Sequence, residues 1–63
     1  MKQVIEALQH AESRARVHAE TYRNLAKAGY DPIANRASAK EEDFFADLYK
    51  RALDSAKAEW VQQ

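Results

Sequence analysis

Apolar residues recur at alternating intervals of four and three through the first half of the chain. This heptad spacing is typical of a helix that packs against another helix along its whole length at a shallow angle. Glycine and proline, which interrupt helices, are absent before residue 29. The pattern predicts a helix over residues 2–28, and the residues of its packing seam are Val4, Leu8, Ala11, Ala15, His18, Tyr22 and Leu25.

A turn follows, where the only glycine and the only proline of the chain stand three positions apart. Gly29 can adopt the left-handed backbone that commonly follows a helix end, and this would pack Tyr30 against Leu25. Asp31 suits the N-cap of a second helix because its carboxylate can accept hydrogen bonds from free backbone N–H groups. Pro32 suits the first helical position, where its missing N–H costs nothing. The turn is therefore expected to be structural.

The second half of the chain, residues 32–61, is predicted to be a helix with an unusually wide apolar face. Its apolar residues span an arc of roughly 200° when each residue advances by about 100°. One neighbouring helix cannot cover so wide a face, so a second molecule is expected to cover the rest. The residues in this arc are Ile33, Ala34, Ala37, Phe44, Phe45, Leu48, Tyr49, Ala52, Leu53, Ala56 and Trp60.

The two helices are expected to form an antiparallel hairpin with its turn at residues 29–31, so that positions whose numbers sum to about 60 lie opposite each other. Small residues then face large ones, which is how helix layers interdigitate. The clearest pairs are Ala15 with Phe44 and Phe45, and Ala11 with Leu48. The sequence therefore predicts an all-α protein with a single helical-hairpin domain over residues 1–63.

Chain length makes self-association the expected source of additional stability. A core built from 63 residues rarely supplies more than about 3–5 kcal/mol. Cysteine is absent, so no disulfide can add to it. We expect a homodimer that forms a four-helix bundle, with Trp60 and Val61 closing its open end beside Met1. One long helix kinked at Pro32 that pairs as an open coiled coil is the alternative.

Hydropathy supports an expectation about where the protein is located, whereas its net charge says little about the class of its partner. Ten basic and ten acidic residues give a net charge of zero, so bulk electrostatics indicate no partner class. Residues 13–40 nevertheless carry six basic and two acidic side chains, so the turn end of the hairpin is expected to be positive. No apolar run approaches the roughly 18 residues of a membrane span. We expect a cytoplasmic protein without membrane contact.

His18 is the one seam residue of the first helix that can gain a proton near neutral pH. The pairing rule places it opposite Glu41 and Glu42, and Glu41 lies in the middle of the apolar arc. The sequence therefore predicts a buried pair that helps to orient the helices, formed by His18 with Glu41, and it leaves Glu42 open as the alternative partner. A metal site is not expected, because His10 and His18 are eight residues apart rather than three or four.

Catalytic motifs are missing from the sequence. The serines and the threonine have no nucleophile-elbow or triad context, and no glycine-rich loop can cradle a phosphate. The carboxylates have the spacing of a solvated, ion-paired helix surface. We therefore expect a protein that is not an enzyme and holds no cofactor.

Nucleic-acid binding is the rival function. Basic residues gather toward the turn, and an aromatic residue there could stack on a base. The neutral net charge and the acidic run at residues 41–43 argue against it, because these carboxylates would meet phosphates. A protein partner could use the same surface, and the candidate residues are Arg14, Arg23, Lys27, Tyr30, Arg36 and Lys40.

Over its whole length the chain resembles the 63-residue proteins encoded in the early exo–xis region of lambda-like bacteriophages. The resemblance lies in overall sequence texture, from "MKQVIEALQHAESRARVHAE" to "ALDSAKAEWVQQ", around the Ala28-Gly29-Tyr30-Asp31-Pro32 turn. It implies a small, non-enzymatic early protein of the infected bacterial cytoplasm. Such a protein would help to bias phage development toward lysis by contacting other proteins, and the resemblance supplies no catalytic residues.

Overall fold

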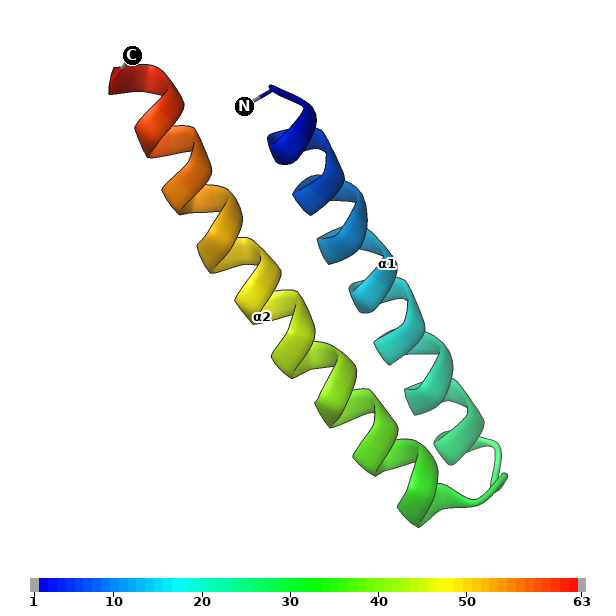
Figure 1. Cartoon of the computed structure of the whole chain (residues 1–63). Helices are drawn as coiled ribbons and strands as arrows, with labels where there is room; N and C mark the ends of the chain where they lie inside the picture. Colours follow the sequence, from blue (N-terminus) through cyan, green and yellow to red (C-terminus); the bar gives the residue numbers. More distant parts are fainter. Residues whose placement is uncertain (1, 63) are drawn as a thin grey trace.

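Two long helices, joined by a short turn, make up the protein (Figure 1). The computed structural model describes residues 2–62, and it describes side chains up to residue 60. Helix α1 runs from Lys2 to Lys27 and helix α2 from Pro32 to Gln62. The helices lie side by side and antiparallel, so the two ends of the chain lie at the same end of the hairpin. The predicted all-helical hairpin is confirmed.

The turn follows the predicted capping chemistry in detail. Gly29 has a φ of +90°, and its N–H donates to the carbonyl of Ala26. The N–H of Tyr30 donates to the carbonyl of Leu25 at 3.0 Å, which completes a Schellman motif. The Tyr30 side chain itself is two-thirds exposed. Backbone hydrogen bonds therefore close the end of α1, and Tyr30 adds little buried surface.

Asp31 caps α2 as the sequence predicts. Its carboxylate accepts a hydrogen bond from the N–H of Ala34 at 3.4 Å, and its carbonyl accepts the first helical bond, from the N–H of Asn35. The φ of Asp31 is +39°, a left-handed value that aspartate tolerates better than most residues. The side chain of Asn35 also donates to the carbonyl of Tyr30. These bonds fix the direction in which α2 leaves the turn.

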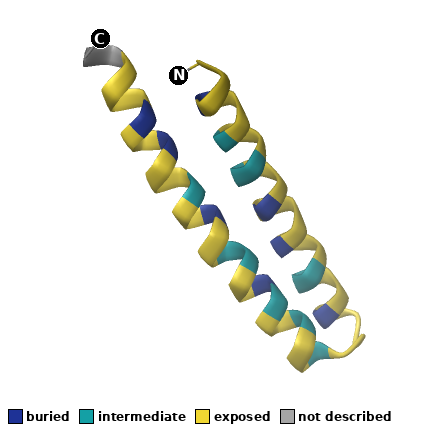
Figure 2. Cartoon of the chain, viewed as in Figure 1, coloured by how far each residue is buried: buried dark blue, intermediate teal, exposed yellow. Residues whose placement is uncertain are grey.

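The buried residues lie along the sides of α1 and α2 that face each other (Figure 2), and most of them are alanines. At one end of these facing sides, Ile5 packs with Leu53 and Ala56, and Leu8 adds to this cluster. These contacts confirm that positions whose numbers sum to about 60 lie opposite each other. We call these facing sides the inner seam; its buried residues are Ile5, Ala15, Ala19, Ala26, Ala39, Ala46, Leu53 and Ala56.

The inner seam differs from the predicted one by a rotation of about one residue on α1. Ala19 and Ala26 are buried, whereas their predicted neighbours His18 and Leu25 are exposed. On α2 the alanines at 39 and 46 are buried and Phe44 is exposed. Alanine lets two helix backbones approach closely and gain dispersion contacts. The larger side chains cannot fit between helices so close together, and they lie beside the seam.

The hairpin is elongated, and the core that its two helices enclose is narrow. It extends over 50 × 14 × 10 Å, and its radius of gyration is 14.5 Å. A compact domain of this length would have a radius of gyration of about 10.6 Å. Within the residues that the structure describes, neither helix is long and apolar enough to cross a membrane.

Candidate functional site

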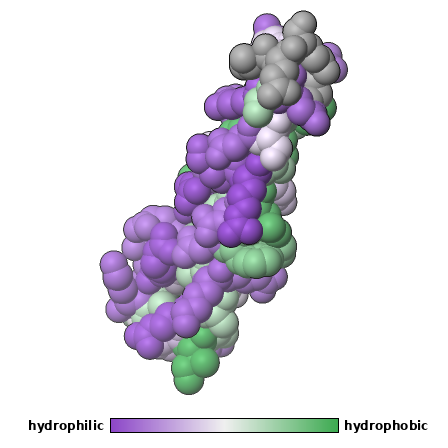
Figure 3. Space-filling view, turned by 90° about the vertical axis from the view of Figure 1, so that its left-hand side faces the viewer, coloured by the Kyte–Doolittle hydropathy of each residue, from purple (hydrophilic) through white to green (hydrophobic). Residues whose placement is uncertain are grey.

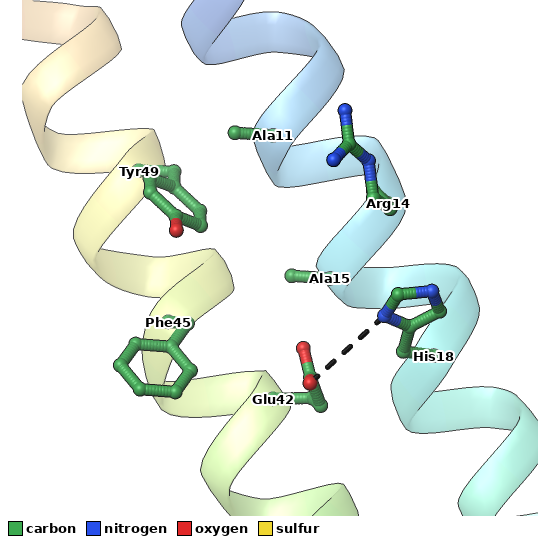
Figure 4. A pocket seen from close by; sticks show the side chains of 7 residues that line it. All are labelled: Ala11, Arg14, Ala15, His18, Glu42, Phe45 and Tyr49. Carbon is green, nitrogen blue, oxygen red and sulfur yellow. Dashed lines mark ion pairs between the residues drawn. The ribbon is translucent and has the colours of Figure 1, made fainter.

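One broad side of the hairpin holds a shallow pocket of about 210 Å³ between the helices (Figure 4). The side chains of Phe45 and Tyr49 border it from α2, and the small side chains of Ala11 and Ala15 form its opposite wall on α1. The pocket is lined in full by Ala11, Arg14, Ala15, His18, Glu42, Phe45 and Tyr49. It is an apolar hollow with charged groups at its edges.

The pocket belongs to a longer apolar strip that the sequence had placed in the packing seam. Residues seven apart lie almost on the same side of a helix, so Val4 and Leu25 share the side of Ala11 and His18. On α2, Leu48 is 42% exposed and stands one turn from Phe45, which is 37% exposed. We call this strip the apolar face; its residues are Val4, Ala11, His18 and Leu25 of α1 and Phe45, Leu48, Tyr49 and Ala52 of α2.

Other exposed large apolar residues lie outside the apolar face, among them Phe44, Ile33 and Trp60. Phe44 is 60% exposed, and its ring meets that of Phe45 edge to face with centroids 6.0 Å apart. Ile33 is almost fully exposed beside the turn, and Trp60 is half-exposed at the open end. The contacts predicted between Trp60, Val61 and Met1 lie outside the described side chains.

His18 approaches Glu42 rather than Glu41. Its Nδ1 lies 3.9 Å from Oε1 of Glu42, and about half of the His18 side chain is exposed. Glu41 is exposed in the single chain. Among the described side chains no polar or charged residue is buried. The partner is therefore the second of the two glutamates that the sequence left open. The pair differs from the predicted one in its exposure, because His18 lies on the apolar face and not in the inner seam.

The other broad side of the hairpin is charged, and its pocket shares no residue with the first one. Two ion pairs join the helices here: Arg23 to Asp43 at 3.0 Å and Arg16 to Asp47 at 4.0 Å. Arg23 also bonds Glu20, and this hydrogen bond is the main reason why the pKa of Arg23 is raised. In the view from the α2 side, hydrophobic residues gather along one edge and hydrophilic ones cover most of the rest (Figure 3).

The predicted basic cluster is divided between these sides. Arg23, Arg36 and Lys40 border one pocket together with Asp43, whereas Arg14 borders the apolar pocket. Lys27 and Tyr30 are exposed near the turn. The positive charge is confined to the tip, because the half of the hairpin nearer the turn, residues 16–45, contains five basic and five acidic residues. The expectation of a positive turn end holds for residues 23–40 and not for the whole half.

Metal ligands are not gathered in the part of the chain that the structure describes. No group of three or more histidine, aspartate or glutamate side chains is placed there so that it could hold a metal ion. His18 and Glu42 form a pair without a third such neighbour in the pocket they border.

Sequence reasoning found the residues of the apolar face. It assigned those of α1 to the contact with α2 of the same chain, and it expected a second molecule to cover part of the wide face of α2. It missed Ala19, Ala26, Ala39 and Ala46 of the inner seam. A second heptad row one residue further on, at Ile5, Glu12, Ala19 and Ala26, was the available signal.

Comparisons with models of protein families, with curated proteins and with solved structures found no significant match.

Proposed function

We propose that this chain is a non-enzymatic interaction protein that works as a homodimeric four-helix bundle. The observation that carries the proposal is the apolar face, a strip of aromatic and aliphatic side chains that the single hairpin leaves in water. Such strips on soluble proteins mark contacts with another molecule. A second hairpin has the length and the helical form to cover the whole strip.

The composition of the inner seam supports this proposal. Of its buried residues only Ile5 and Leu53 are larger than alanine. None of the large side chains that the structure describes is fully buried. Hydrophobic stabilisation grows with the apolar area removed from water, and small domains are marginal even with well-filled cores. The hairpin therefore needs the burial that a second copy would provide.

The role that we propose for the dimer is regulatory, as the resemblance to early-region proteins of lambda-like bacteriophages implies. It would act in the cytoplasm of the infected bacterium through contacts with other proteins. The proposed dimer would bury the apolar face, so contacts with other proteins would use the charged side. Arg36 and Lys40 at its tip are exposed and are the first residues to test.

Sedimentation equilibrium over a wide range of protein concentrations tests the dimer. We expect a mass of twice the 7.2 kDa of the chain, with helicity lost on dilution as the dimer dissociates. A mass of 7.2 kDa at all concentrations, with full helicity, would contradict the proposal.

Nucleic-acid binding, the rival function, makes a different prediction. Phosphate contacts weaken steeply as salt rises, so a gel-shift assay at two salt concentrations is decisive. Arg23, which borders the pocket on the charged side, already bonds Glu20 and Asp43. We therefore expect no shift even at low salt. A shift at low salt that disappears at high salt would favour the rival.

A further inference from the structure

Four residues on α1 form a hole of the kind that receives a side chain from a neighbouring helix. In knobs-into-holes packing, each knob enters a hole made by four residues of the facing helix. Such a hole consists of residues i, i+3, i+4 and i+7 of one helix. This spacing is found on α1 in four residues that all line the apolar pocket: Ala11, Arg14, Ala15 and His18. Two of them are alanines, whose small side chains leave the hole shallow. The pocket that these four residues line, together with Glu42, Phe45 and Tyr49 of α2, has a volume of about 210 Å³. We call these four residues the α1 hole.

We propose that the α1 hole is filled by Phe45 of a second copy of this chain, and that the two turns of the dimer therefore lie at the same end. The proposal rests on the homodimer proposed above and adds its orientation. In this arrangement α1 of each copy packs on α2 of the other, around a twofold axis that runs along the bundle. Both holes are filled by the same contact, as the symmetry of an isologous dimer requires.

The positions of the residues along the hairpin lead to this orientation. Ala15 and Phe45 of one chain line the same pocket, so they lie at the same distance from the turn. A twofold axis along the bundle keeps that distance unchanged. It therefore brings the second copy's Phe45 directly over the hole, where the ring meets two alanine side chains. Arg14 at the edge of the hole can then lie against the face of the ring, as arginines do in cation–π contacts.

The opposite orientation leaves the hole empty. If the turns lay at opposite ends, the twofold axis would cross the hairpin near its middle and α1 would pack on α1. Ala15 would then face the second copy's Ala15, a methyl group opposite a methyl group. The aromatic residues near Phe45 would meet each other on the neighbouring helix. Large side chains opposite small ones give native packing density, and large opposite large do not.

The ends of the hairpin fit the same orientation. On α1 the large residues of the apolar face are at its two ends, Val4 and Leu25. On α2 they are near the middle, and Ala52 lies toward the open end. With both turns at one end, the second copy's Val4 would lie over the small residues near Ala52. At the open end, as at the α1 hole, a large residue would thus face small ones.

The exposed area of the single chain is in line with a dimer of this kind. The chain exposes 4784 Å², whereas a compact monomer of its mass would expose roughly 4,100 Å². The excess of roughly 700 Å² is close to the 800 Å² that each partner buries in an interface of standard size. One face-to-face contact with a second copy would remove it.

A spin label at the turn distinguishes the two orientations. The chain has no cysteine, so Tyr30→Cys gives one labelling site, at a side chain that is two-thirds exposed. Neighbouring helices lie about 8–10 Å apart, so we expect the two labels of a dimer to be within about 25 Å of each other. Opposite turns would place them close to the 50 Å length of the hairpin. The measurement is a pulsed electron double resonance distance, with circular dichroism to verify folding.

Gln3→Cys, at the open end, provides the matched second label. It too should give a short distance, because both open ends lie together. Long distances from both labels in a protein of dimeric mass would overturn the orientation and leave the homodimer intact. A monomeric mass without dipolar coupling would overturn the homodimer as well, so the two failures are distinguishable.

Discussion

Replacement of Phe45 by alanine is the most direct perturbation of the proposed dimer. Phe45 is 37% exposed in the single chain, and the dimer would cover the rest of its ring. Phe44 provides a matched control, because it is the same residue type, stands next to it and is 60% exposed. Phe44 does not line the pocket beside the α1 hole, so the proposed dimer is expected to leave most of it in water.

The size of the effect follows from the exposed area of the ring. A phenylalanine side chain offers about 200 Å², so 37% exposure leaves roughly 75 Å² for the second copy to cover. At about 25 cal/mol per Å² this is about 2 kcal/mol per copy. Both copies lose the ring, so the dimer loses about 4 kcal/mol, which corresponds to a rise in Kd between roughly a hundredfold and a thousandfold.

Sedimentation equilibrium across protein concentrations measures Kd for both variants. Phe44→Ala should change Kd by less than about threefold. Its edge-to-face contact with Phe45 is made within one chain and is lost equally from monomer and dimer. If Phe45→Ala leaves Kd unchanged, or if the two variants weaken the dimer equally, the assignment of Phe45 to the interface is wrong.

Three further experiments test the hairpin itself. Leu53→Ala removes a side chain that is 3% exposed and should lower the free energy of unfolding, measured by urea denaturation, by about 2–3 kcal/mol. Val17→Ala on the outer surface should lower it by less than about 0.5 kcal/mol. Equal losses would contradict the assignment of Leu53 to the inner seam. Gly29→Ala places a side chain at φ +90° and should lower the free energy of unfolding by about 1–2 kcal/mol. Nothing lies within 4 Å of the added Cβ, so the cost comes from the backbone, and Gly29→Asn should cost less because asparagine tolerates left-handed backbone. A larger cost for Gly29→Asn than for Gly29→Ala would refute this reasoning. Arg23→Met should lower Tm by the same amount at pH 6 and pH 9. The bond to Glu20 raises the pKa of Arg23, so the stabilising effect of this bond is fully present below the pKa of arginine in the unfolded chain. It is lost only above the pKa of Arg23 in the folded chain, and both values lie above pH 9. The difference should shrink at high salt, and a change in its size between the two pH values would contradict it.

The turn could be predicted residue by residue because its chemistry is local. Gly29, Asp31 and Pro32 each have a backbone preference that depends on no distant contact. The structure places Gly29 and Pro32 where their preferences are satisfied. The Asp31 carboxylate accepts the predicted capping bond, although its φ of +39° is left-handed. Tyr30 is the exception, because its predicted packing depended on side-chain burial, and its side chain is two-thirds exposed.

The inner seam could not be chosen from the sequence because α1 carries two heptad rows side by side. One row contains Ala19 and Ala26, and the other contains His18 and Leu25. Periodicity is equal in both, and the size of the apolar residues favours the second. Which row packs against α2 depends on how closely the two backbones can approach. That distance depends on the facing residues of α2, where Ala39 and Ala46 are buried. The buried row of α1 is therefore determined by both helices together and not by α1 alone.

The presence of both rows is itself an argument for a bundle. A helix that packs against one neighbour needs one heptad row, and each helix of a four-helix bundle packs against two neighbours. On α1, Ala15 is buried in the inner seam and also lines the apolar pocket, so the two rows meet at this residue. A monomeric hairpin would have no use for the row at Ala11 and His18, or for a wide apolar face on α2. The same sequence would serve both contacts of a dimer, with alanine in the seam within each chain and aromatic residues between the chains.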